Sequence, residues 1–174
     1  MRVRNLMQFL TKRPRERQVV TRGWFGLGLV PPAIESDEII PGTVMLWSGP
    51  VTVSDAKVCA RYHPDPKFAR RFEEMLTLPR ERVVVIDGAH EGASISVRDV
   101  VEQLAGFDAD IRILVPGYGE RGLRNAQAAD INVYGESLVF IDYDHEPGRR
   151  IPRPPRKVEE RMVENFVRLL KGTQ

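Results

Sequence analysis

Two short apolar runs, each stopped by an aspartate, constrain the fold of this chain most. Residues 82–88 read Arg-Val-Val-Val-Ile-Asp-Gly, and residues 138–144 read Leu-Val-Phe-Ile-Asp-Tyr-Asp. Uninterrupted β-branched runs of this length are typical of strands buried on both faces of a parallel sheet. Carboxylates at the carboxyl ends of such strands lie on the edge where open α/β sheets gather their ligands. The sequence therefore predicts an α/β fold with a candidate site at that edge.

The pattern between these two runs predicts a layered domain. A helix over 96–105 opens with a capping-box pattern, and a strand over 110–115 follows it. A short helix over about 120–129 then precedes a strand at 138–142. Because strands joined through helices run parallel, we expect 82–87, 110–115 and 138–142 to be parallel neighbours. The predicted fold is α/β, with a three-layer, mostly parallel, Rossmann-like sheet.

Smaller elements are expected in the first half of the chain. Apolar residues at helical spacing indicate a short amphipathic helix over 1–11, and a second helical pattern covers about 52–62. Asp65 followed by Pro66 is a typical start of a third helix, because Asp caps well and Pro fits the first helical position. Residues 18–50 contain Gly and Pro too densely for long elements.

Charge is distributed unevenly, although the net charge of the chain is only +2. Residues 1–23 carry seven Lys or Arg against one Glu, giving +6, and residues 146–174 carry eight basic against four acidic residues, giving +4. The middle of the chain therefore carries 2 − 10 = −8. We expect a basic N-terminal arm and irregular segment over 1–40, a core domain over 41–146, and a Pro/Arg-rich linker with a C-terminal helix over 147–174.

Basic clusters in these extensions are candidate contacts for a polyanion such as nucleic acid. Two other interpretations remain open: the charged side chains stay solvated, or the extensions dock on neighbouring protein subunits. The candidate nucleic-acid contacts are Lys12, Arg13, Arg15, Arg17, Arg149, Arg150, Arg153 and Arg156.

Composition excludes several classes of protein. The single cysteine, Cys59, rules out an intrachain disulfide and a zinc site built from cysteines. No apolar run approaches the roughly 20 residues that a membrane helix needs. The basic N-terminus lacks the apolar core and small-residue cleavage site of a signal peptide. We therefore expect a cytoplasmic protein with no membrane partner.

Three aspartates at the strand ends form a candidate metal site. In a parallel sheet, Asp87, Asp142 and Asp144 would meet at one edge, where their mutual repulsion favours a cation. Clustered carboxylate oxygens suit Mg²⁺, which could polarise a phosphodiester. His90 and Glu91 follow Asp87 closely and could move a proton or add a ligand. The alternative is that these aspartates merely cap turns and helices, as strand-terminal aspartates often do.

The same residues resemble a Toprim domain, the module shared by topoisomerases, bacterial primases and several nucleases. The resemblance rests on Asp87-Gly88-Ala89-His90-Glu91, the glycines of 117–119, and the Asp-x-Asp pair in 142–148, within about residues 82–150. It implies a Toprim-like sheet, nucleic acid as partner, and Mg²⁺-dependent phosphodiester cleavage or transfer. In that resemblance Asp87 stands where the family has its acid/base Glu, and Asp142 and Asp144 stand at the metal-binding pair.

Two further readings stay open. Residues 83–94 faintly resemble the phosphoribosyltransferase loop, which would imply a degenerate nucleotide-binding protein, although the family's Thr-Gly phosphate cradle is missing. The other reading needs no chemistry: a non-catalytic assembly or scaffold protein whose basic arms dock on neighbouring subunits. A degenerate, non-catalytic Toprim-like domain is also compatible with the sequence, because Asp87 is one methylene shorter than Glu.

Overall fold

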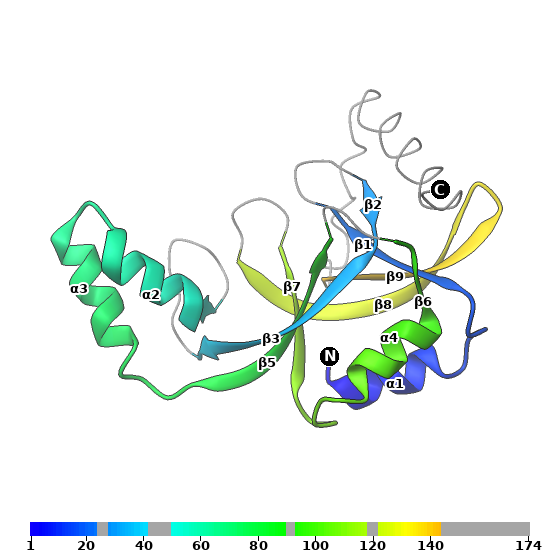
Figure 1. Cartoon of the computed structure of the whole chain (residues 1–174), viewed down its shortest axis with the longest axis horizontal. Coiled ribbons are helices and arrows are strands. Elements are labelled where there is room, and N and C mark those ends of the chain that lie inside the picture. Colours follow the sequence, from blue (N-terminus) through cyan, green and yellow to red (C-terminus); the bar gives the residue numbers. More distant parts are fainter. Residues whose placement is uncertain (24–27, 42–49, 90–92, 118–121, 144–174) are drawn as a thin grey trace, which may run out of the picture.

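The computed structural model describes residues 1–23, 28–41, 50–89, 93–117 and 122–143. In these residues, four helices accompany one curled sheet of nine strands (Figure 1). The helices are α1 (Val3–Leu10), α2 (Val53–Tyr62), α3 (Pro66–Met75) and α4 (Val97–Leu104). The strands are β1 (Gln18–Arg22), β2 (Leu29–Val30), β3 (Pro32–Ile40), β4 (Val51–Thr52), β5 (Glu81–Gly88), β6 (Ile95–Ser96), β7 (Arg112–Pro116), β8 (Leu123–Val133) and β9 (Glu136–Tyr143).

The sheet is mostly antiparallel, so the predicted three-layer, mostly parallel Rossmann-like or Toprim-like sheet is wrong. Its strand order is β2-β1-β9-β8-β7-β5-β3-β4, with β6 also paired to β1. Only β1 with β9 and β5 with β7 pair in parallel, whereas the other described pairs are antiparallel. The strands at 82–87 and 110–115 are parallel neighbours as expected, but β8 separates them from the strand at 138–142.

The main cause of this error is β8, which the sequence predicts as a helix over 120–129. Its Arg, Gln and Ala residues have high helix propensities, but propensity is a small contribution, and pairing on both sides with β7 and β9 overrides it. A tight turn at Tyr134 and Gly135 then reverses the chain, with φ of 52° and 87°. Two consecutive positive φ values define the hairpin turn whose twist matches its flanking strands. The connection is therefore a hairpin, which makes β8 and β9 antiparallel.

The sheet curls until the end of β5 meets β1 and β2. Three strands separate β5 from β1 in the sheet order. Nevertheless, a Cβ atom placed on Gly88 would lie 2.7 Å from Val30 Cγ2 and 3.0 Å from the Arg22 carbonyl oxygen. Only Pro31 separates β2, at one edge of the sheet, from β3, which lies next to the last strand, β4, at the other edge. The chain around Pro31 therefore links the two sides of this half-barrel.

We expect Gly88→Ala to destabilise the protein by about 1–3 kcal/mol, because no room exists for the new methyl group. Gly106→Ala is the matched control. A Cβ atom there would lie 3.6 Å from the Gln103 carbonyl oxygen, which is an ordinary contact. Urea unfolding of the two variants measures the difference. Equal midpoints for Gly88→Ala and the wild type would show that β5 does not approach β2 so closely.

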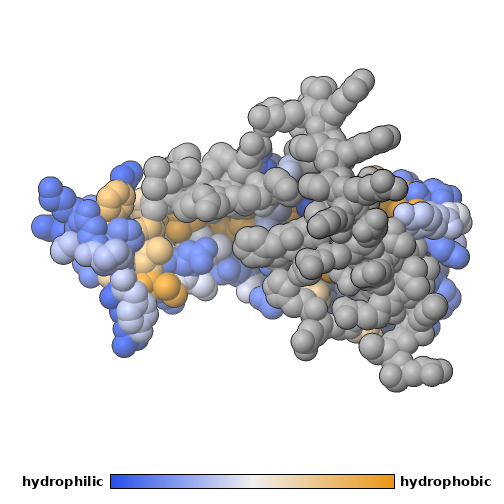
Figure 2. Space-filling view, turned by 90° about the horizontal axis from the view of Figure 1, so that it is seen from above, coloured by the Kyte–Doolittle hydropathy of each residue, from blue (hydrophilic) through white to orange (hydrophobic). Residues whose placement is uncertain are grey.

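Helices α2 and α3 form a hairpin that projects from one end of the sheet (Figure 1). As predicted, Asp65 caps α3, accepting a hydrogen bond from Lys67 N at 2.9 Å, with Pro66 in the first turn. A small core of its own holds the hairpin together and joins it to the end of β3: Ile40, Val51, Val53, Ala56, Phe72 and Met75. Figure 2 shows hydrophilic and hydrophobic residues side by side at this end of the molecule.

The main core lies where α1 and α4 pack against the sheet. Leu6 and Leu10 of α1 are 0% exposed, and Val3 is 2% exposed. They share one cluster with α4 and with the strands β1, β5, β7, β8 and β9. The capping box predicted at the start of α4 is confirmed, and the hydrogen bonds from Ser96 lower the pKa of Asp99. The N-terminal residues are therefore part of the body, and the predicted basic N-terminal extension is wrong.

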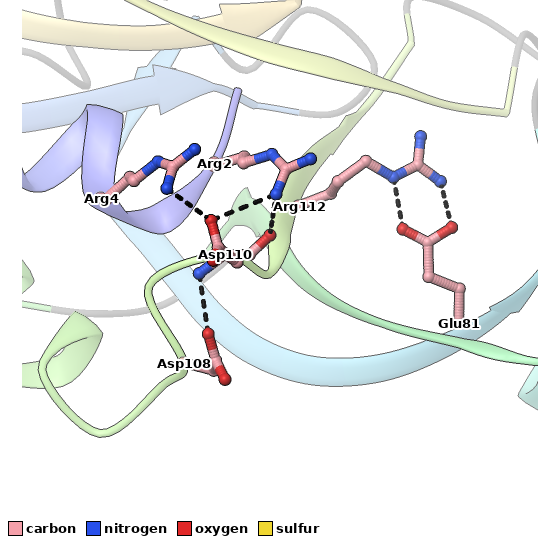
Figure 3. Close-up of polar contacts among 6 residues, drawn as sticks. All are labelled: Arg2, Arg4, Glu81, Asp108, Asp110 and Arg112. Carbon is pink, nitrogen blue, oxygen red and sulfur yellow. Dashed lines mark hydrogen bonds and ion pairs between the residues drawn. The ribbon is translucent and has the colours of Figure 1, made fainter.

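Hydrogen bonds and ion pairs fasten this N-terminal segment (Figure 3). Arg2 and Arg4 both reach Asp110 Oδ1, at 3.1 and 2.8 Å. The backbone of the segment also bonds to the chain before and within β7, through Val3 N to the Ile111 carbonyl and Ile113 N to the Met1 carbonyl. Two of the N-terminal basic residues thus act as anchors to the body.

The predicted Pro/Arg-rich linker and C-terminal helix, over 147–174, lie outside the described residues. Among the residues that are described, no helix has the length and apolar composition that a membrane crossing needs.

Candidate functional site

Asp142 is buried in an ion pair. It lies near the end of β9, and its side chain is 7% exposed. Arg22, at the end of the neighbouring strand β1, donates to Asp142 Oδ2 from Nη2 at 2.8 Å and from Nε at 3.2 Å. The other carboxylate oxygen accepts the backbone N–H of Tyr143 at 2.9 Å. A guanidinium group therefore neutralises the carboxylate that the sequence assigns to a metal.

Asp87 lies in different surroundings, near the end of β5. Its Oδ1 accepts the N–H of Gly88 at 2.6 Å. Across the strand pair it faces Ala33, and its side chain lines a hollow on the surface of β3 and β5. No set of three or more His, Cys, Asp or Glu side chains within the described residues could hold a metal ion. Asp144, His90 and Glu91, the other predicted members of the site, lie outside those residues.

We name this depression the acidic hollow. It has a volume of about 420 Å³, and its lining residues are Ala33, Glu35, Asp37, Val85, Asp87, Gly88 and Ala89. Residues 33, 35 and 37 alternate along β3 onto one face, as do 85 and 87 along β5, which explains why three carboxylates share it. Glu35 and Asp37 make no ion pair with any described residue, and Glu35 is exposed. The hollow therefore gathers three carboxylates, and two of them, Glu35 and Asp37, have no ion-pair partner among the described residues.

The predicted nucleic-acid residues near the N-terminus are only partly available. Arg13 and Arg17 both bind Asp130 on β8, at 2.7 and 2.9 Å, and Arg13 also stacks on the Phe9 ring. The hydrogen bond from Arg13 is the main reason that the pKa of Asp130 is lowered. Lys12 and Arg15 are exposed. The other candidates, Arg149, Arg150, Arg153 and Arg156, lie outside the described residues.

A different surface, which the sequence interpretation misses, carries exposed apolar side chains. Within or just after the α2–α3 hairpin, Val58, Tyr62, Phe68 and Leu78 are 58%, 67%, 37% and 44% exposed. Val58 and Tyr62 lie four residues apart on α2, away from the buried Val53 and Ala56. That spacing alone could have indicated a second apolar face on this helix. Several large apolar side chains exposed on one projecting element indicate a candidate protein contact surface.

Basic residues accompany these side chains at the end of the hairpin. We call residues 57–71 the hairpin tip. Five Lys or Arg and one Asp occur there, so its charge is 5 − 1 = +4 with His63 neutral. The single acid, Asp65, is used as the cap of α3. His63 packs against Phe68 at 5.1 Å between ring centroids, which orders the turn between the helices. The tip thus combines apolar, aromatic and cationic side chains.

Comparison of the chain with protein-family models, curated proteins and solved structures finds no match. The function must therefore be inferred from the two surfaces described above, the acidic hollow and the hairpin tip.

Proposed function

We propose that this protein is an assembly protein that associates with copies of itself through the α2–α3 hairpin. The observation that supports the proposal best is the exposure of Val58, Tyr62 and Phe68 on a projecting, separately packed hairpin. Fully burying an apolar side chain of this size contributes about 1.5–3 kcal/mol. Tyr and Arg are also the residues that most often dominate the binding energy of protein interfaces. A cytoplasmic setting is part of the proposal, in keeping with the single cysteine, Cys59.

Magnesium-dependent chemistry on nucleic acid has less support from the described residues. Asp142 is paired with Arg22, and Arg13 and Arg17 are paired with Asp130. The chemistry would need these groups to bind a metal or a phosphate, but each of them is already bound to a side chain of opposite charge. The apolar side chains of the hairpin are exposed to water, whereas these charges are already paired. The hairpin is therefore the better candidate for a contact surface.

The mass of the protein in solution tests the proposal. Sedimentation velocity from low to high micromolar concentration should show a shift from monomer to larger species. In the double variant Tyr62→Ser with Phe68→Ser, that shift should disappear, because the main apolar contacts of the hairpin are lost. Tyr134→Ser is the matched control, since Tyr134 is 74% exposed but lies in the β8–β9 turn. A wild-type protein that stays monomeric throughout, or a double variant that associates as well as the wild type, would contradict the proposal.

A further inference from the structure

We propose that the hairpin tip of one molecule docks in the acidic hollow of the next, so that copies associate head to tail. This inference rests on the proposed function and names the surface that receives the hairpin. Three observations carry it: the opposite charges of the two surfaces, the separation of the tip from the hollow, and the lack of ion-pair partners, among the described residues, for five of their charged side chains. These five are Glu35, Asp37, Arg61, Lys67 and Arg71.

The charges of the two surfaces are complementary. The tip carries +4, and three carboxylates line the hollow without any basic residue among its lining. Some charges of these elements are already paired: Arg70, one of the five basic residues of the tip, binds Glu74 at 3.6 Å, and Glu38 of β3 binds Arg80 at 3.5 Å. By contrast, Arg61, Lys67 and Arg71 have no acidic partner among the described residues, and neither Glu35 nor Asp37 has a basic one. The unpaired charges of this region are therefore segregated, positive on the tip and negative in the hollow.

The contact forms between molecules because the end of the hairpin lies away from the hollow. The hollow follows β3 and β5 between Asp37 and Gly88. The hairpin joins the sheet through β4 and the start of β5 and projects away from it, so that the turn between α2 and α3 lies farthest from the sheet (Figure 1). An interface between two different surfaces is heterologous, and repetition of such an interface produces a ring or an open filament. The fold thus supplies both halves of a repeating contact.

The hollow also has the form to receive the tip. Its volume of about 420 Å³ lies within the range of sites that bind side chains and small groups. Val85 and Ala33 provide an apolar floor between the carboxylates. Aromatic and cationic groups from the tip would meet apolar and anionic groups there. A nucleic-acid strand would also be attracted by the basic tip, but the carboxylates of the hollow would repel it. Binding of nucleic acid would therefore give the hollow no role.

Charge reversal provides the test. One variant combines Glu35→Lys with Asp37→Lys, and a second combines Arg61→Glu with Lys67→Glu. Each variant alone places like charges in the contact, so its self-association should weaken by about tenfold or more. An equimolar mixture restores opposite charges, since the basic tip of the first variant meets the acidic hollow of the second. Association in the mixture should therefore return close to that of the wild type. Glu102→Lys, on the exposed side of α4, is the control and should change nothing.

Several outcomes would overturn the inference. If both reversals leave association unchanged while Tyr62→Ser with Phe68→Ser abolishes it, the hairpin binds another surface, and only the proposed assembly function survives. Failure of the mixture to recover, with both variants folded by circular dichroism, overturns the hollow as receptor. If the combination of Glu35→Lys with Asp37→Lys perturbs β3, the single variant Glu35→Lys replaces it in the same test. Finally, a single-stranded oligonucleotide could bind the wild type at low salt and bind the variant with Arg61→Glu and Lys67→Glu more weakly. If the wild type also stayed monomeric, the partner of the tip would be nucleic acid instead.

Discussion

A chain that lacks residues 1–11 is expected not to fold. That segment supplies Val3, Leu6 and Leu10 to the main core, where they are 2%, 0% and 0% exposed. Burial of each such side chain contributes about 1.5–3 kcal/mol, so the three together approach the whole stability of a typical domain, about 5–15 kcal/mol. The deletion also uncovers the apolar faces of α4 and the strands beneath it. Far-UV circular dichroism and urea titration would measure the loss. A cooperative transition at the wild-type midpoint would show that α1 does not belong to the core.

Leu6→Ala is the graded version of this experiment. It should cost about 2–5 kcal/mol, because the cavity lies inside a closely packed cluster. Gln8→Ala, on the exposed side of the same helix, should cost almost nothing. Asp110→Asn removes the partner of both Arg2 and Arg4, but these groups are more than half exposed and the loss should stay below about 1 kcal/mol. The order of the three effects distinguishes anchoring by the core from anchoring by surface ion pairs.

Local signals in the sequence predict individual elements well. The cap and first turn of α3, the capping box of α4 and the amphipathic stripe of α1 are confirmed, because each depends on residues within a few positions of one another. The apolar run of β5 is buried as expected, since Val83 and Val84 are both 0% exposed although they point to opposite faces. Strand order depends on pairings far apart in the chain. Nothing local shows that β1 inserts beside β9, 120 residues later.

The charge pattern was the most misleading signal. It marks the N-terminal residues as an extension, and their basic character is real, but α1 has an apolar face that the core requires. Arg2, Arg4, Arg13 and Arg17 then satisfy carboxylates of the body. A count of charges cannot distinguish a basic arm from a basic surface of a packed helix. The sequence does not show the exposure of Phe68 either, because apolar residues at helical spacing usually face a core.

Asp142 illustrates how far the sequence leads toward a site. Its position after a buried run correctly marks it as unusual, and it is one of few buried charged residues among those described. Its partner, Arg22, comes from β1 and could be found only through the parallel register of β1 with β9. The two interpretations of Asp142, metal ligand or partner of Arg22, make opposite predictions for the same substitution.

We expect Asp142→Asn to destabilise the protein by about 3 kcal/mol, because it leaves a partly buried guanidinium without its carboxylate. If Asp142 instead suffered repulsion within an empty metal site, the substitution would leave the stability unchanged or increase it. Urea unfolding at pH 7, with and without millimolar Mg²⁺, measures both possibilities. Asp87→Asn is the matched comparison, since Asp87 is another strand-end aspartate and is half-buried, with its Oδ1 accepting the backbone N–H of Gly88.

A double variant separates the ion pair from general damage to β9. Replacing both partners, Arg22→Met with Asp142→Leu, removes the two charges together and leaves neither one unpaired. Such replacements of buried pairs are often neutral, so the double variant should recover most of the stability that Asp142→Asn loses. A double variant that is no more stable than Asp142→Asn would mean that Asp142 acts through contacts other than Arg22. Stabilisation of the wild type by Mg²⁺ that Asp142→Asn abolishes would restore the metal interpretation, because a ligand that binds only the folded state raises its stability by mass action.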